Sequence, residues 1–188
     1  TEFFIEEHRF VVPGGLLKDD HFKSSPLTVT EIIKYSSNIG AAKMAINMGA
    51  KRTVKYLHDF GFGRHPGLDW PGIASGALRN PEKTKTIELA IAAYGHGVNA
   101  TALQLASAVA TIGNKGVRMT PWLIREVRDS NGTPLDVFKP KVDRRVISED
   151  TASKALMMMT EVTSFDCLPG RTVRGSCRGT GTRARVPG

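Results

Sequence analysis

The stretch that most constrains the fold is residues 28–49, where two helical patterns meet at a polar tripeptide. Thr28 and Glu31 have the spacing of a capping box and open a short apolar helix. After the tripeptide, apolar residues recur at helical spacing until Gly49, which offers a left-handed stop. The pattern therefore predicts two consecutive helices with almost no linker between them.

The tripeptide itself is Ser36-Ser37-Asn38. Serine and asparagine compete for backbone hydrogen bonds, so three in a row mark a cap or an interruption of a helix. Capping of the second helix by Ser37 or Asn38 explains the tripeptide without any chemistry. Taken alone, the tripeptide favours this structural interpretation over a catalytic one.

Four further helices are expected. The first runs from Lys51 to Phe60, and the second covers Thr86 to Tyr94. Thr101 caps the third, whose buried face is expected at Leu105, Val109 and Ile112. The fourth follows Ser148, and its expected buried residues are Ala152, Ala155, Leu156, Met159 and Val162.

Strand signals are fewer. Residues 1–26 mix apolar and charged residues around Pro13-Gly14-Gly15, which indicates a short strand or hairpin. Asn131-Gly132 separates two apolar runs and predicts a second hairpin over residues 121–138. Residues 63–81 are rich in glycine and proline and are expected to form an irregular loop.

Length and charge set broad limits. A chain of 188 residues with 40% hydrophobic and 23% charged residues fits one globular domain. No apolar run approaches the ~20 residues of a membrane helix, and the start lacks a basic region followed by an apolar one. The net charge of +8 invites a basic helical module for nucleic acid or an anionic polymer. Its basic residues are scattered except near the C-terminus, so an exposed basic loop is favoured and no nucleic-acid partner is expected.

Metal and cofactor signals are absent from the sequence. The five histidines show no pairing at metal-ligand spacing, and His96, between two glycines, is interpreted as a loop side chain. Cys167 and Cys177 lack a neighbouring histidine and form either a disulfide or two free thiols. The glycine-rich run at residues 179–182 lacks the ending of a phosphate loop. No cofactor and no metal are expected.

Several short motifs occur in a fixed order along the chain. They are Leu27-Thr28-Val29, Ser36-Ser37-Asn38-Ile39-Gly40-Ala41-Ala42-Lys43, Phe60-Gly61-Phe62-Gly63, and Tyr94-Gly95-His96-Gly97 followed by Thr101 and Gln104. The ordered set resembles the transpeptidase domain of class B penicillin-binding proteins, the enzymes that cross-link bacterial peptidoglycan. The resemblance extends from about Leu27 to Thr163 and resumes at Gly179 to Gly188, which looks like the cell-division type.

The resemblance implies an α/β (α+β) fold of the penicillin-binding transpeptidase and serine β-lactamase kind. Residues 1–188 would be a partial transpeptidase domain, mostly α-helical with an accessory β-hairpin. The chain departs from the family at Pro71-Gly72-Ile73, where Pro-Gly-Glu is common, and at residues 164–178, which would be an insertion or a coding-frame error.

The superfamily carries three motifs, Ser-x-x-Lys, Ser-x-Asn and Lys-Thr-Gly. Only the middle one occurs here, since no serine is followed three residues later by lysine and the chain has no Lys-Thr-Gly. The resemblance therefore implies an internal fragment that is inactive alone because it lacks the nucleophile. A non-catalytic penicillin-binding homologue is the remaining alternative within this family.

By the same resemblance, a serine attacks the D-alanyl carbonyl of a stem peptide, and β-lactams acylate that serine. Ser36 would relay a proton toward the leaving amine, while Asn38 would hold the catalytic lysine and the substrate amide. Ser37 receives no role. The implied partners are stem peptides, β-lactams and cell-division membrane proteins, at the extracytoplasmic face of the bacterial inner membrane. The anchor of the parent would lie outside this chain.

Overall fold

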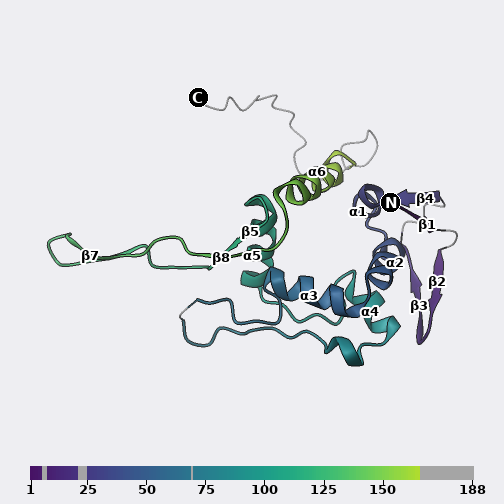
Figure 1. Ribbon diagram of the computed structural model, residues 1–188, viewed down its shortest axis with the longest axis horizontal. Coiled ribbons are helices and arrows are strands. Elements are labelled where there is room, and N and C mark those ends of the chain that lie inside the picture. Colours follow the sequence, from purple (N-terminus) through teal and green to yellow (C-terminus); the bar gives the residue numbers. More distant parts are fainter. Residues whose placement is uncertain (6–7, 21–24, 69, 166–188) are drawn as a thin grey trace.

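The computed structural model describes residues 1–5, 8–20, 25–68 and 70–165. Within these ranges the chain forms helices α1 to α6, one 3-10 turn, and strands β1 to β8 paired in two-stranded antiparallel sheets. In Figure 1 the helices form the body, the β2–β3 hairpin lies at one side, and the β6–β7 hairpin extends away on the other. The strands thus go beyond the single accessory hairpin expected from the resemblance.

The N-terminal segment forms two strand pairs against the helices. Strand β1 (Glu2–Ile5) pairs with β4 (Ser25–Thr28), and β2 (Arg9–Val12) pairs with β3 (Gly15–Lys18). The turn between β2 and β3 falls at Pro13-Gly14, where Gly14 has a φ of 95°. The predicted N-terminal hairpin is therefore confirmed.

The next four helices follow the predicted boundaries closely. They are α1 (Val29–Lys34), α2 (Asn38–Met48), α3 (Ala50–Phe60) and α4 (Thr86–Ala92). The 3-10 turn η1 (Pro81–Lys83), just before α4, was not predicted. The Thr28–Glu31 capping box is present, and Gly61 ends α3 in the left-handed conformation. Local sequence signals thus place the helix ends.

A hydrophobic core cluster joins the N-terminal strands to α1, α2 and α4. Its buried members are Ile5, Val12, Leu17, Leu27, Ile32, Ile39, Ala42 and Ala90. Ala42 of α2 and Ala90 of α4 are both fully buried, so small side chains occupy the places where these two helices contact each other. This cluster lies directly beneath the start of α2.

Helix α5 (Ala102–Gly113) turns a different face inward from the predicted one. Leu105 is 57% exposed and Val109 is 50% exposed, whereas Gln104, Ala108 and Thr111 are buried. The prediction of a core stripe at Leu105 and Val109 is wrong. The reason is that the loop after α3 covers the polar side of the helix, where Gln104 donates to backbone carbonyls of that loop.

Helix α6 (Glu149–Phe165) is covered only in part. Ala152 is 1% exposed, as predicted, but Leu156, Met159 and Val162 are exposed, so the predicted buried face is wrong for these three. Among the other helices, α6 contacts α1 and α5.

The C-terminal half of the described chain contributes four strands. They are β5 (Val117–Met119), β6 (Glu126–Arg128), β7 (Pro134–Val137) and β8 (Val142–Arg145). The β6–β7 pair is the predicted hairpin, and the β5–β8 pair was not predicted. Asp59 of α3 holds Arg144 of β8 at 3.0 Å, which ties the base of this region to the helical body.

The cysteines, the basic C-terminal residues and most of the predicted insertion at 164–178 lie outside the described residues. Among the helices that are described, none is both long and apolar enough to span a membrane.

Candidate active-site corner at the start of α2

Helix α1 ends in a Schellman motif that places Ser36 at the corner. The Ser36 amide donates to the Ile33 carbonyl at 3.2 Å and the Ser37 amide donates to the Ile32 carbonyl at 3.0 Å. Ser36 has a φ of 55°, a conformation that glycine usually occupies in this motif and that costs other residues about 1–2 kcal/mol. Backbone strain of this kind persists where the surrounding packing fixes it, and it is found often at functional sites.

Ser37 is the cap of α2 and is buried at 4% exposure. Its Oγ accepts from the Gly40 amide at 2.9 Å and donates to Asp19 Oδ2 at 2.7 Å. The capping interpretation of the tripeptide is therefore confirmed for Ser37, while Asn38 is the first helical residue. Because Ser37 is the cap, the side chains of Ser36 and Asn38 are not needed to cap α2.

Asn38 is half-buried, and its side chain has a defined orientation. Its Nδ2 donates to the Lys18 carbonyl at 3.1 Å. A carbonyl can only accept, so the amide nitrogen of Asn38 must face β3, and its Oδ1 lies on the other arm of the amide. One N–H is thus engaged by the scaffold, and an acceptor on the opposite arm can meet a cationic or N–H donor.

Ser36 is exposed, in contrast to its neighbour Ser37. The chain therefore presents a hydroxyl from Ser36 and an amide from Asn38 at the surface, from two residues that flank a buried cap. These are the two side chains that the sequence singled out, and the fold brings them to one helix junction.

The junction is tight because residue 40 is glycine. A Cβ atom at Gly40 would lie 2.6 Å from Cγ1 of Ile32, which is closer than real side chains approach. Ile32 is 2% exposed and belongs to the core cluster. The approach of α1 to α2, and hence the geometry of the corner, depends on this missing side chain.

Two charged groups on α1 are already engaged near the corner. The Thr28 backbone and side chain donate to the Glu31 carboxylate, which holds the pKa of Glu31 below its usual range. Lys34 donates to Glu161 of α6 at 2.9 Å, and this hydrogen bond raises the pKa of Lys34. Lys34 is thus already paired with a carboxylate of α6 and is not free to act as the base that activates a serine.

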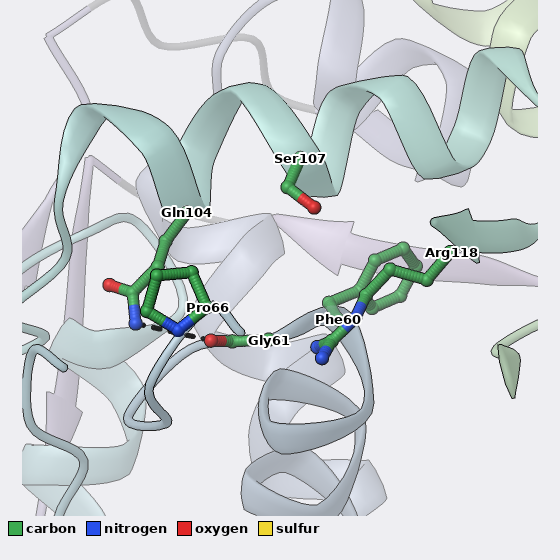
Figure 2. Close-up of a pocket in the computed structure, with 6 residues that line it drawn as sticks. All are labelled: Phe60, Gly61, Pro66, Gln104, Ser107 and Arg118. Carbon is green, nitrogen blue, oxygen red and sulfur yellow. Dashed lines mark hydrogen bonds between the residues drawn. The ribbon is translucent and has the colours of Figure 1, made fainter. Parts of the chain in front are cut away.

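A separate small cavity lies between α3 and α5 (Figure 2). Its volume is about 10 Å³, which holds roughly one water molecule. Gln104 Nε2 donates to the carbonyls of Gly61, Arg64 and Ser75 and so ties the loop onto α5. This cavity is too small for a peptide and has a structural role. In the sequence, Gly61 and Gln104 belong to the ordered motifs, but nothing there indicated that they would be in contact.

A wider hollow of about 300 Å³ lies at the base of the β6–β7 hairpin. Its lining is mostly apolar, with Trp70, Trp122 and Phe138 among its residues, and the lining residues that the structure describes include no acid, base or thiol. This hollow is suited to binding an apolar group and not to acyl transfer.

The described histidines and acids offer no metal centre. Within the described ranges, no group of three or more His, Cys, Asp or Glu residues could hold a metal ion. His96 is exposed and packs edge-on against Tyr94, with the two ring centroids 5.3 Å apart. Burial raises the pKa of the Tyr94 hydroxyl. The prediction that His96 is a loop side chain is confirmed.

A Ser-x-Asn motif at a helix junction, in a chain of mixed helices and strands, is typical of serine transpeptidases of the penicillin-binding class. The family described as Penicillin binding protein transpeptidase domain matches residues 10–187. The chain belongs to this family. The match begins earlier than the resemblance seen in the sequence motifs, because it includes the β2–β3 hairpin.

Relatives of the chain are longer proteins. Penicillin-binding protein PbpB of Mycolicibacterium smegmatis is 31% identical over 177 residues, which are 93% of this chain and 26% of that protein. Peptidoglycan D,D-transpeptidase FtsI of Escherichia coli is 30% identical over 172 residues, which are 90% of this chain and 25% of that protein. The chain spans about a quarter of the length of these relatives.

Solved structures agree with the family. The crystal structure of penicillin binding protein 3 from Mycobacterium tuberculosis, complexed with aztreonam, matches with a TM-score of 0.76 at 25% sequence identity. The match covers 86% of this chain and 36% of that one. The fold expected from the resemblance is confirmed.

Proposed function

We propose that these 188 residues are part of a serine D,D-transpeptidase that cross-links peptidoglycan stem peptides through an acyl-enzyme, and that Ser36 and Asn38 are catalytic residues of it. The observation that carries the proposal is the exposed Ser36 beside the oriented Asn38 amide, at the junction of two helices in a transpeptidase-family chain. The proposal covers residues 1–188 as a partial domain.

The two residues have distinct roles in the proposed reaction. A hydroxyl both donates and accepts, so Ser36 suits the transfer of a proton toward the leaving amine. Asn38 Oδ1 can accept from a lysine ammonium, and its second N–H can donate to the substrate carbonyl. The scaffold already engages the first N–H at Lys18, so the amide is held before substrate arrives.

The nucleophile of the proposed reaction lies outside this chain. A serine hydroxyl needs a neighbouring base, and in this superfamily the Ser-x-x-Lys motif supplies both groups. No such motif occurs in the sequence, and Lys34 is already paired with Glu161. The chain alone is therefore expected to be inactive.

The substrate and location follow from the same proposal. The partners are stem peptides, β-lactams and cell-division membrane proteins, at the extracytoplasmic face of the bacterial inner membrane. The aztreonam complex of a structural relative supports the β-lactam part.

A fluorescent penicillin tests the proposal. The 188-residue chain is expected to take up no covalent label, whereas a full-length transpeptidase carrying it is labelled. In that full-length protein, Ser36→Ala and Asn38→Ala are expected to slow acylation by about 10²–10⁴-fold, the range of one lost proton-transfer group. Circular dichroism of each variant is the control for folding.

Two outcomes would overturn parts of this proposal. Covalent labelling of the isolated chain would show that it contains its own nucleophile. Acylation at the wild-type rate in both variants would remove Ser36 and Asn38 from the mechanism, and DNA binding that weakens with salt would then favour the basic binding module.

A further inference from the structure

Asp19 is a buried carboxylate that the proposed chemistry does not use. It directly follows β3 and is 8% exposed. Its Oδ2 accepts from the Ser37 hydroxyl at 2.7 Å, and its Oδ1 accepts from the Ile39 amide at 2.9 Å. Burial of an unpaired carboxylate would be costly, and these two hydrogen bonds offset that cost.

Both contacts fall on the first turn of α2. The first amides of a helix have no partner within the helix, and here Asp19 takes that of Ile39 while Ser37 takes that of Gly40. Negative charge is also favourable at a helix N-terminus. Asp19 therefore holds the start of α2 at two points, the backbone amide of Ile39 and the side chain of the cap Ser37.

The residue before Asp19 holds the side chain of Asn38. The Lys18 carbonyl accepts from Asn38 Nδ2 at 3.1 Å. Residues 18 and 19 thus hold the side chain of Asn38 and the backbone next to it at the same time. These contacts are not local in sequence, because the residues that donate to Lys18 and Asp19 lie 18 to 20 positions later in the chain.

Strand pairing and core packing support residues 18 and 19. Strand β3 pairs with β2 over its whole length, and Leu17, two residues before Asp19, is 2% exposed in the core cluster. The Asp19 amide also donates to the His8 carbonyl at 3.4 Å. A displacement of Asp19 relative to α2 would need the β2–β3 hairpin to move against the core.

We infer that Asp19 is a positioning residue for the acyl-transfer corner, acting through Ser37 and the Ile39 amide to set where Ser36 and Asn38 present their polar groups. This inference rests on the proposed function. Asp19 itself is buried at 8% exposure, so its proposed effect on the reaction passes through Ser37 and Ile39.

The test separates positioning from mere stability. In a full-length transpeptidase carrying this chain, acylation by a fluorescent penicillin is measured over a range of drug concentrations, which separates drug binding from the acylation rate constant. Asp19→Ala is expected to lower that rate constant by about tenfold to a hundredfold, because a displacement near 1 Å costs that much. Drug binding is expected to change little. All variants are measured well below their melting temperatures.

A conservative variant gives the second readout. Asp19→Asn keeps an oxygen for the Ile39 amide but replaces the acceptor of the Ser37 hydroxyl by a donor. Its acylation rate constant is expected to fall, but by less than in the alanine variant, because the acceptor of the Ile39 amide is kept. If Asp19→Ala does not fold, this variant decides, and a wild-type rate constant in it overturns the inference.

Asp59→Asn is the matched control. Asp59 is another largely buried carboxylate, but it pairs with Lys55 and Arg144 on α3 and β8, not with residues of the corner. It is expected to lower the melting temperature and to leave the acylation rate constant unchanged. An equal fall in rate constant for Asp59→Asn and Asp19→Asn would show a general effect of destabilisation and overturn the inference.

The inference and the proposed function can fail separately. If Ser36→Ala slows acylation but Asp19→Ala acylates at the wild-type rate constant, the positioning role is wrong and the proposed function stands. If Ser36→Ala and Asn38→Ala both acylate normally, the catalytic roles proposed for these two residues are wrong and the positioning role is overturned with them.

Discussion

In both the corner at the start of α2 and the β6–β7 hairpin, an aspartate accepts two hydrogen bonds, but one aspartate is buried and the other lies in an exposed turn. Asp19 accepts two hydrogen bonds from residues that lie 18 and 20 positions later and is buried. Asp129 also accepts two, from the amides of Asn131 and Thr133, in the turn of the hairpin. The first connects distant segments across the core, and the second only closes a turn.

The packing around the two regions differs accordingly. The strands and helices of the corner contribute fully buried residues such as Ile32 and Ile39. Every residue of β7 and β8 is exposed, including Leu135 at 66% and Val137 at 58%. The comparison indicates that turn chemistry alone can specify the hairpin, whereas a precise polar site requires a dense core beneath it.

Truncation of one apolar residue in each region gives the largest expected contrast. Ile39 is 1% exposed, so Ile39→Ala is expected to lower the free energy of unfolding by about 2–5 kcal/mol. Val137→Ala on β7 is expected to change it by less than about 0.5 kcal/mol, because that side chain is already in water. Urea unfolding of both variants measures the difference, and equal losses would contradict it.

Removal of the two aspartates should give the next largest difference. Asp19→Ala leaves the Ile39 amide and the Ser37 hydroxyl without their acceptor in a buried place, at a cost of about 1–3 kcal/mol for each unpaired group. Asp129→Ala frees two amides that water can reach in the turn, so a loss below about 1 kcal/mol is expected. Thermal unfolding checks this order, and a larger loss at Asp129 would reverse the interpretation.

The glycine at residue 40 allows a finer test of the corner. Gly40→Ala forces a methyl group against Ile32, which costs about 1–3 kcal/mol, while the better helix propensity of alanine returns about 1 kcal/mol. A net loss near 1 kcal/mol is expected. Gly113→Ala in α5 is the control, since nothing lies within 4 Å of the added methyl group, and it should be neutral or stabilising. If both substitutions stabilise the protein in urea, the close approach of α1 and α2 is not required.

The smallest expected effect is on the pH dependence of stability, through Asp59, which pairs with Arg144 of β8. The hydrogen bond from Lys55, with a further one from Arg144, holds the pKa of Asp59 below its usual range. Its contribution to stability is therefore complete above the unfolded pKa of about 3.9 and is lost as the pH falls through the lower folded value. Asp59→Asn should flatten the fall in unfolding free energy below about pH 4, measured by urea titration at several pH values. An unchanged slope would show that this carboxylate is not coupled to folding.

The sequence predicted those parts of the fold that depend on neighbours in the chain. The Thr28–Glu31 capping box, the cap at Ser37, the end of α3 at Gly61 and the β6–β7 turn were all visible as local spacings. Each depends on hydrogen bonds between residues a few positions apart, which sequence patterns record directly.

The faces of α5 and α6 were not predicted correctly, because apolar periodicity identifies a stripe but not what covers it. Gln104 is buried and Leu105 is exposed because a loop 29 to 43 residues away supplies three carbonyls to the glutamine amide. Asp19 was missed for a related reason. Its partners begin 18 residues later, and nothing in its local surroundings marks it.

The left-handed backbone at Ser36 has a consequence for protein engineering. Glycine adopts this conformation without the steric cost that a side chain brings, so Ser36→Gly should raise the free energy of unfolding by roughly 1 kcal/mol. A library selected only for heat resistance should therefore be enriched in this substitution. Such a selection would discard the hydroxyl together with the strain. If Ser36 has the proposed catalytic role, a screen of a full-length transpeptidase that also scores β-lactam labelling would retain the serine, and the ratio of serine to glycine would then report how strongly activity opposes stability at this position.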